Sequence, residues 1–549
     1  MKKRFFCGFM ALAMSIALFT GCNPDNGAGT GGIENDASGD IVMAFSGLTQ
    51  QTDMGLVESA VSAYTKEKLG FGVKFVFIST TDQDSMYNSK IAAQEQLDLL
   101  NISFGNPTSY ITQKKVREIE SLITEDNAPH LLDAIEENPS LLSRHSDGKA
   151  YGLSTIEEYY IYGGTYIIRK DILEEVGLYG DGEGQYKEWD KIGYEDLDKI
   201  FAAVAADPEA SSAPGGGTAY ACGKLGTEDL VRYFVPFDPV CSALTTPAGV
   251  IMMNRENQAS ADKSKIVNLY ETDEYKEYVE WMGKWNAAGY MHKDAATSTS
   301  TVTDMLRTGK FVGAFVDSDA KFSVEYSQDY GNGNEFVQFV ITEPYYYAGA
   351  PAIGWYVNYQ SKMPNKAMRF LDLVWSDRYL VNLLAYGIEG THYNVVDTEE
   401  CPREEGIMTV PEGVTKGARY TVGGFYGDKS MYYYWASEDE AISETLEKRN
   451  FIREKDTEFT ATALANTSPA LGFVYNAGRK TTTITNINVK IKQYAGRLSV
   501  GAGSKGSDGT YTGPGSTYAE FISELKNRKI DDIISDKQSQ LNEWLASKN

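Results

Sequence analysis

The chain has 549 residues and a formal net charge of −25, and 42% of its residues are hydrophobic. This length needs more than one hydrophobic core, and the composition is that of a folded globular protein, which excludes wholesale disorder. The negative charge argues against nucleic acid as a partner, because the chain and a phosphate backbone would repel each other.

The N-terminus has the pattern of a bacterial lipoprotein signal. Lys2, Lys3 and Arg4 precede an apolar run over 5–19, which has the length of a signal-peptide core and is short for a membrane span. Small residues and then Cys22 follow, so we interpret 1–21 as the signal peptide and Cys22 as the lipidated residue. An ordinary signal peptide with an incidental cysteine is the alternative. We expect a protein held by its lipid at the extracytoplasmic face of the cell membrane, at the cell surface or in the periplasm.

The segment after Cys22 differs from the rest of the chain. Residues 22–39 are rich in Gly, Asn and Asp and predict a flexible tether. Strand and helix patterns then alternate, with strands expected at 41–45, 73–78 and 97–102 and helices at 57–64 and 85–96. This order predicts a mostly parallel, helix-covered sheet of the α/β class, in which ligands bind beyond the carboxyl ends of the strands. Ser46, Ser103 and Phe104 are therefore expected at a ligand-binding rim.

The alternation continues through the middle and the end of the chain. Strands are expected at 159–169, 311–316 and 336–341, and helices at 170–176, 273–288, 366–375, 378–385, 518–526 and 530–545. Trp281 and Trp285 recur at helical spacing, which favours core positions over a ligand platform.

The cysteines indicate neither a disulfide framework nor a zinc site. Of the 5 Cys, Cys7 leaves with the signal peptide and Cys22 carries lipid, which leaves Cys222, Cys241 and Cys401 with no CxxC spacing. Cys222 and Cys241 could pair, or they could be buried free thiols.

Catalytic motifs are weak throughout. The 4 His show no metal-ligand spacing, and no GxSxG turn is present. The GxGxxG match at 501–506 continues into more loop, where a nucleotide site needs a helix. With 76 Asp and Glu in the chain, a pair of carboxylates says nothing about glycosidase chemistry. The sequence therefore predicts no enzyme, no cofactor and no metal.

Several short motifs follow one another along nearly all of the chain after residue 40. They are 97–100 (LDLL), 149–154 (KAYGLS), 167–173 (IIRKDIL), 267–289 (VNLYETDEYKEYVEWMGKWNAAG) and 364–371 (PNKAMRFL). This set resembles the type 2 extracellular solute-binding lipoproteins of ABC carbohydrate importers. Residues 381–397 (VNLLAYGIEGTHYNVVD) and 520–547 are similar to the larger lipoprotein subfamily.

The resemblance implies a two-lobed type 2 periplasmic-binding-protein fold with a hinge and a central ligand cleft. Lobe I is expected to comprise 40–160 with 340–400, and lobe II to comprise 161–339 with 401–549. The implied function is capture of a carbohydrate, foremost an oligosaccharide, by hinge closure and delivery to the permease subunits of an ABC transporter by a monomer. Alternatives are a surface glycan-degrading enzyme and a binding protein for peptide or another solute.

Sugar recognition needs rings that stack on pyranose faces and side chains that donate and accept hydrogen bonds. The candidate ligand residues are Ser46, Ser103, Phe104, Thr155, Glu157, Tyr159, Tyr160, Glu228, Asp317, Trp355, Tyr356, Glu389, His392 and Tyr393. Trp355 is expected on a loop, where stacking and simple packing are alternative roles. Asp317 could instead belong to a helix N-cap region, Glu157 could be solvated, and His392 could bond backbone groups of its own turn.

Overall fold

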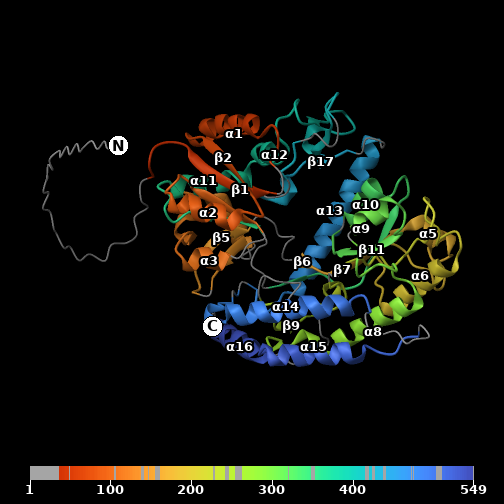
Figure 1. The fold of residues 1–549 in the computed structure, drawn as a ribbon. Coiled ribbons are helices and arrows are strands. Elements are labelled where there is room, and N and C mark those ends of the chain that lie inside the picture. The colour runs from red at the N-terminus through yellow and green to blue at the C-terminus, as the bar shows by residue number, and fades with distance from the viewer. Residues whose placement is uncertain are drawn as a thin grey trace, which may run out of the picture. The chain divides into compact units, whose positions relative to one another are not determined.

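The computed structural model shows two sheet-centred lobes (Figure 1). It describes residues 36–47, 50–103, 107–137, 141–145, 147–154, 161–226, 229–240, 247–253, 263–298, 300–319, 321–347, 353–414, 420–422, 427–436, 441–471, 473, 475–501 and 510–547. The predicted signal peptide and Cys22 lie outside these residues. Within them, no helix combines the length and the apolar character needed to cross a membrane.

The first lobe is built on a six-stranded sheet with the order β2-β1-β3-β14-β5-β4. Its strands are β1 (Ile41–Gly47), β2 (Val73–Ser79), β3 (Leu99–Ser103), β4 (Leu142–Arg144), β5 (Ala150–Ser154) and β14 (Ile353–Val357). β1 runs parallel to β2 and β3, and β14 runs antiparallel to β3 and β5. The prediction of a mostly parallel sheet was wrong. Because β14 returns from far along the chain and pairs antiparallel with β3 and β5, and β4 pairs antiparallel with β5, the sheet is mixed.

Helices cover both faces of this sheet. They are α1 (Met54–Leu69), α2 (Gln83–Ala92), α3 (Pro107–Thr112), α4 (Pro129–Glu137), α11 (Pro364–Ser376) and α12 (Arg378–Tyr386). One hydrophobic cluster joins β1 and β14 to α1, α11 and α12, and a second lies on the opposite face against α2 and α3. Alternate residues of a strand point to opposite faces, so both neighbours in a central strand become buried.

The second lobe is centred on three antiparallel strands in the order β11-β7-β12. They are β7 (Gly164–Arg169), β11 (Gly313–Asp317) and β12 (Phe336–Val340). Around them lie α5 (Lys170–Glu175), α6 (Tyr194–Ala206), α7 (Val231–Phe234), α8 (Asp273–Ala288), α9 (Val302–Arg307), α10 (Phe322–Tyr330) and a small sheet of β8 (Phe237–Asp238), β9 (Val250–Met252) and β10 (Ile266–Val267). Trp285 is fully buried, which confirms its predicted core role, and Trp281 is partly buried and packs against the same cluster.

Two crossings between the lobes are paired with each other. β6 (Ile161–Tyr162) leads into the second lobe and β13 (Tyr345–Tyr346) leads out of it, and these strands form an antiparallel pair. The hydroxyl of Tyr345 donates to the carbonyl oxygen of Phe237 at 3.1 Å and accepts from the Phe237 N–H at 3.3 Å. The paired crossings are therefore fastened to the second lobe.

A third connection is the helix α13 (Ile442–Ala465). Near its start, the buried guanidinium of Arg449 bonds to the carboxylate of Glu405. Beyond its end, the Ser468 N–H donates to the carbonyl oxygen of Tyr346 at 2.8 Å. The sequence analysis did not predict α13, because its apolar residues form no single stripe along the helix. It also did not predict α6 or α14 (Thr481–Leu498).

The last helices, α14, α15 (Gly515–Asn527) and α16 (Ile530–Ser547), belong with the second lobe. Their buried residues, among them Ile487, Phe521 and Ile533, share one hydrophobic cluster with Trp285. The predicted helices 518–526 and 530–545 are confirmed within these bounds.

The region that follows α12 contacts the first lobe. A small sheet is formed by β15 (Asn394–Val395), β16 (Ile407–Thr409) and β17 (Tyr434–Trp435). Arg378 of α12 donates to the carbonyl oxygens of Glu404 at 2.6 Å and Met431 at 3.2 Å. Because these bonds tie this region to a first-lobe helix, we propose that lobe I extends to Trp435 instead of ending at residue 400.

The buried carboxylate of Asp98 connects two segments of the first lobe by hydrogen bonds. Asp98 accepts a hydrogen bond from the Val42 N–H at 2.8 Å and another from the Ser361 hydroxyl at 2.5 Å, and it is 1% exposed. It thus joins the first strand of the lobe to the segment that returns after β14.

We predict that Asp98→Ala lowers the free energy of unfolding by about 1–3 kcal/mol, because the buried Val42 N–H loses its partner. Urea unfolding followed by circular dichroism measures this change. Asp133→Ala, at an exposed position of α4, is the matched control and should leave the midpoint nearly unchanged. Equal midpoints for the two variants would contradict the role given to Asp98.

Candidate functional site

The strands of the first lobe end together at one edge of its sheet. Gly47 ends β1, Ser103 ends β3 and Ser154 ends β5, and Ile353 begins the antiparallel β14 beside them. Register pairs Ile353 with Ser103 and Gly354 with Ser154. The sheet therefore brings four segments far apart in the sequence to a common rim, which is where ligands of α/β sheets bind.

Two of the predicted ligand residues belong to strands that end at this rim. The backbones of Ser46 and Ser103 are in β1 and β3 as expected, while their side chains are not described. Phe104, Thr155, Glu157, Tyr159, Tyr160 and Glu228 lie outside the described residues, and their assignment as ligand residues stays a prediction.

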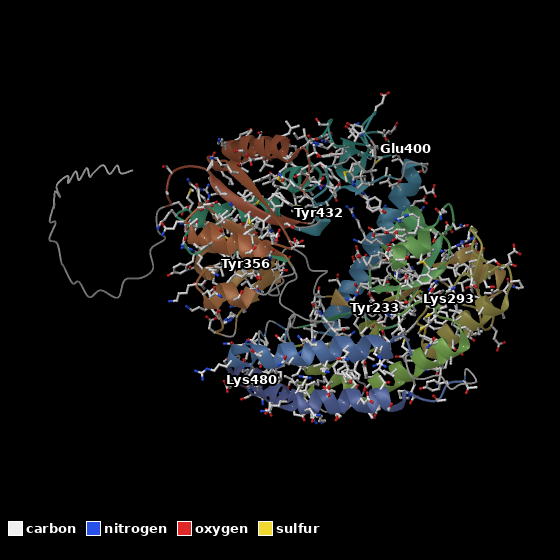
Figure 2. The ribbon with its side chains drawn as sticks, in the orientation of Figure 1. Tyr233, Lys293, Tyr356, Glu400, Tyr432 and Lys480 are labelled. Atoms are coloured by element: carbon white, nitrogen blue, oxygen red, sulfur yellow. The ribbon has the colours of Figure 1, made fainter. Side chains whose placement is uncertain are left out.

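The structure corrects the predicted positions of Trp355 and Tyr356. They lie in the central strand β14, not on a loop, and each is 1% exposed. Trp355 belongs to the hydrophobic cluster on one face of the sheet and Tyr356 to the cluster on the other. Figure 2 labels Tyr356 within the first lobe. Helices cover both faces, so neither ring presents a face to a ligand here.

The loop after α12 is also turned inward. His392 is buried, and its Nδ1 accepts from the Ile388 N–H at 2.7 Å, which leaves the proton on Nε2, 3.4 Å from the Asp53 carboxylate. Glu389 forms a bidentate ion pair with Arg403, in which Arg403 Nη1 lies 2.8 Å from Glu389 Oε1. This ion pair lowers the pKa of Glu389.

Tyr393 is 1% exposed, and burial raises the pKa of its hydroxyl. Of the alternatives left open for His392, the structure places it in the one that bonds its own turn. The ion pair of Glu389 and the burial of Tyr393 fix the conformation of this loop, and the assignment of these two residues to the ligand stays a prediction.

The second lobe has an edge of its own that gathers polar groups. Asp317 ends β11 opposite Gly164, which begins β7. The Thr342 hydroxyl accepts from the Gly164 N–H at 2.6 Å, and the Ser318 hydroxyl lies 3.3 Å from that of Thr165. The Asp317 side chain is 41% exposed, so this predicted ligand residue stands at an accessible edge.

Arg232 and Tyr233 belong to this edge, and the sequence analysis missed them. An Arg232 Nη2 lies 3.6 Å from Asp317 Oδ2, and the guanidinium covers the Tyr233 ring at 4.6 Å from its centroid. Both residues sit on the four-residue helix α7, directly after the polar stretch 226–229. The adjacent Arg-Tyr pair was a usable signal, because a stacked guanidinium is well held for bidentate hydrogen bonding.

Gly164 is required by the close approach of this short helix. A Cβ at Gly164 would lie 1.8 Å from the carbonyl oxygen of Tyr233. Only a residue without a side chain lets the start of β7 meet α7, so glycine here sets the position of Arg232 beside Asp317.

The described residues hold little else that bears on chemistry. Among them, no group of three or more His, Cys, Asp or Glu has a geometry that could hold a metal ion. Cys222 and Cys401 are buried free thiols. Cys241 lies outside the described residues.

Two α/β lobes, each with a polar sheet edge and joined by paired crossings, define the architecture of the two-domain solute-binding proteins. Residues 469–546 match the family model described as a domain of unknown function, DUF3502. A carbohydrate ABC transporter substrate-binding protein from Streptococcus pneumoniae serotype 4 is 25% identical over 296 residues. The alignment spans about half of each protein, 52% of this chain and 53% of that relative.

Solved structures match over most of the chain. The N-glycan transport solute-binding protein NgtS of Streptococcus pneumoniae covers 93% of this chain with 100% of its own, at 19% identity and a TM-score of 0.71. Its complexes with Man1GlcNAc and Man5GlcNAc give 0.62 and 0.59 over the same coverage, at 19% and 18% identity. An extracellular solute-binding protein of Bifidobacterium longum subsp. infantis gives 0.58 at 13% identity over 92% and 98% of the two chains. These likenesses confirm the resemblance and the two-lobed α/β fold predicted from the sequence.

A buried acid under the second-lobe edge generates a pH-dependent prediction. Burial raises the pKa of Asp229 to about 6, although hydrogen bonds from Tyr278 and from the Val231 N–H act in the opposite direction. The folded state then holds the proton more tightly than the unfolded state. Asp229 therefore favours folding below about pH 4, and this contribution is lost as the pH rises to 6.

Asp229→Asn should be more stable than the parent at pH 7.5 by about 2 kcal/mol, and the difference should shrink towards pH 4.5. Urea unfolding at pH 7.5 and pH 4.5 measures the stability difference between variant and parent at each pH. Asp181→Asn, at a residue 89% exposed, serves as the control. A difference that is the same at both pH values would refute the proposed burial of charge.

Proposed function

We propose that this protein captures a carbohydrate, foremost an oligosaccharide, between its two lobes and delivers it to an ABC importer. The observation that carries the proposal is the joining of two polar sheet edges by paired crossings, in a fold shared with solute-binding proteins. The relatives bear names of carbohydrate-binding proteins, and their ligands include N-glycan and fructan oligosaccharides. We extend that class of ligand, and not any one sugar, to this chain.

The chemistry of the second-lobe edge suits such a ligand. A sugar hydroxyl both donates and accepts, so a carboxylate and a guanidinium side by side can satisfy neighbouring hydroxyls. Asp317 and Arg232 supply this pair, and the stacking of Arg232 on Tyr233 holds it in place. Rings for stacking on the sugar would come from Phe104, Tyr159 and Tyr160 beyond the first-lobe rim.

Capture is proposed to proceed by closure of the two lobes about their crossings. The paired crossings β6 and β13, which Tyr345 fastens to the second lobe, support a hinge at this point. A ligand touching both lobes would shift the population towards a closed form.

We propose a binding role without catalysis, in line with the relatives, which are substrate-binding proteins and not enzymes. We propose from the signal pattern that the mature protein is anchored through Cys22 on the extracytoplasmic side. The motifs that resemble those of importer lipoproteins support the permease subunits of an ABC importer as its partners.

A thermal-shift screen tests the ligand class. Neutral oligosaccharides of mannose, fructose and milk-glycan type should raise the melting temperature, because a ligand at 100 times its Kd adds about 2.7 kcal/mol to the folded state. Peptides should leave the melting temperature unchanged. Cleavage products appearing in the same mixtures would favour the enzyme alternative, and a response to peptides alone would overturn the carbohydrate assignment.

A pair of variants then tests the second-lobe edge with whichever oligosaccharide binds. Asp317→Ala should weaken binding about tenfold to a hundredfold in calorimetry, because a charge-assisted hydrogen bond to the ligand is lost. Asp181→Ala, an exposed carboxylate of the same lobe, should bind like the parent. Equal affinities would remove Asp317 from the site. Solution scattering should show a smaller radius of gyration with ligand, and no compaction would contradict hinge closure.

A further inference from the structure

The point at which the chain enters the folded body is fastened to a helix end. The Asp36 carboxylate accepts hydrogen bonds from the N–H groups of Asn365 at 3.1 Å and Lys366 at 2.5 Å, in the first turn of α11. Met363, which precedes α11, makes no side-chain capping hydrogen bond. Asp36 therefore acts as the hydrogen-bond acceptor at this helix N-terminus. A carboxylate at a helix N-terminus also interacts favourably with the helix dipole.

Further bonds fix the direction of the chain beyond Asp36. The Lys366 ammonium donates to the carbonyl oxygens of Ala37 at 2.8 Å and Gly39 at 2.9 Å. The Ala37 N–H donates to the carbonyl oxygen of Lys362 at 2.8 Å. The segment 36–39 is thus held along the start of α11, on the first lobe.

Cations surround this entry point. The basic collar consists of Lys66, Lys74, Lys362, Lys366 and Arg369, and all except the half-buried Lys366 are exposed. The Lys66 ammonium lies 3.2 Å from the Asp40 carboxylate, and Lys366 and Arg369 lie 5.5 and 5.9 Å from the centroid of the Phe71 ring.

The carboxylate of Asp40, which lies beside Lys66, is stabilised in its charged form. A hydrogen bond from the Gly72 N–H, together with the charges of Lys66 and Lys74, lowers the pKa of Asp40. Asp36 and Asp40 are both engaged by these contacts, whereas Lys74, Lys362 and Arg369 are exposed to solvent.

This concentration of positive charge stands out in a chain whose net charge is −25. An anionic membrane would repel most of the body, whereas each lysine or arginine held near such a surface gains about 1 kcal/mol. The proposed lipid sits on Cys22, and the residues 23–35 between it and Asp36 can span at most about 50 Å. The tether therefore limits the distance between the entry point and the proposed anchor.

We propose that the basic collar faces the membrane and binds anionic lipid headgroups, which orients the first lobe towards the bilayer. The proposal rests on the lipid anchor at Cys22 and is independent of the ligand class. The interaction would weaken with added salt, because exposed charges are screened within about 8 Å at physiological ionic strength. The role of the Asp36 clamp is to hold the end of the tether in the middle of the collar.

Lysine footprinting on vesicles tests this orientation. The full lipidated protein is reconstituted in phosphatidylcholine vesicles with or without about 30% phosphatidylglycerol, a source of negative surface potential, and labelled with an amine-reactive ester. By mass spectrometry, Lys66, Lys74 and Lys362 should be labelled at least twofold less on the anionic vesicles. Lys293 and Lys529, exposed lysines of the second lobe, should be labelled equally on both (Figure 2 marks Lys293).

The outcomes separate the two proposals. Protection that disappears at high salt supports the collar, as does its loss from Lys66 and Lys362 in the variant Lys74→Glu, whose melting temperature shows that it is folded. Equal labelling on both vesicles, with the protein still floating with them, overturns the collar and leaves the anchor standing. Failure to float with vesicles overturns the anchor and with it this inference. Solute binding measured in detergent is unaffected by any of these results.

Discussion

The antiparallel pairing of β6 with β13 is the constraint on which the two-lobed arrangement depends. The chain must leave the first sheet after β5 and return to it as β14, and both passages run through this one pair. Tyr345 fastens the pair to the second lobe through the backbone of Phe237. We propose that bending between the lobes occurs on the first-lobe side of this pair.

The return crossing explains the burial of residues that sequence reasoning assigned to the ligand. β14 lies between β3 and β5, so every residue in its middle has neighbours on both sides and helices above and below. A Gly-Trp-Tyr segment then serves the cores of both faces. The polar groups left for a ligand are at the strand ends, where no neighbouring strand competes for them.

Several tyrosines of the second lobe are buried in its core, as Tyr356 is in the first lobe. Burial raises the pKa of Tyr166, Tyr275 and Tyr278, and the Tyr166 hydroxyl donates to the carbonyl oxygen of Ala221 at 2.9 Å. A buried tyrosine needs such a partner for its hydroxyl. These buried tyrosines therefore belong to the core of the second lobe and are not available to a ligand.

The sequence by itself determined many of the local elements and the fold class. Helix 273–288 and the strands at 41–45, 73–78, 311–316 and 336–341 were predicted close to their observed bounds, because each carries its own apolar periodicity and end signals. The resemblance motifs added the two lobes. What the sequence left open was which polar residues come together, as with the Arg232–Asp317 pair.

Only the tertiary structure decided that Trp355 is core, that His392 bonds its own turn, that Arg232 lies against Asp317, and that Asp36 caps a helix more than three hundred residues away. Each of these depends on contacts between segments distant in sequence. Periodicity within one segment records whether a residue is apolar or polar, and it carries no information about what the rest of the chain places beside it.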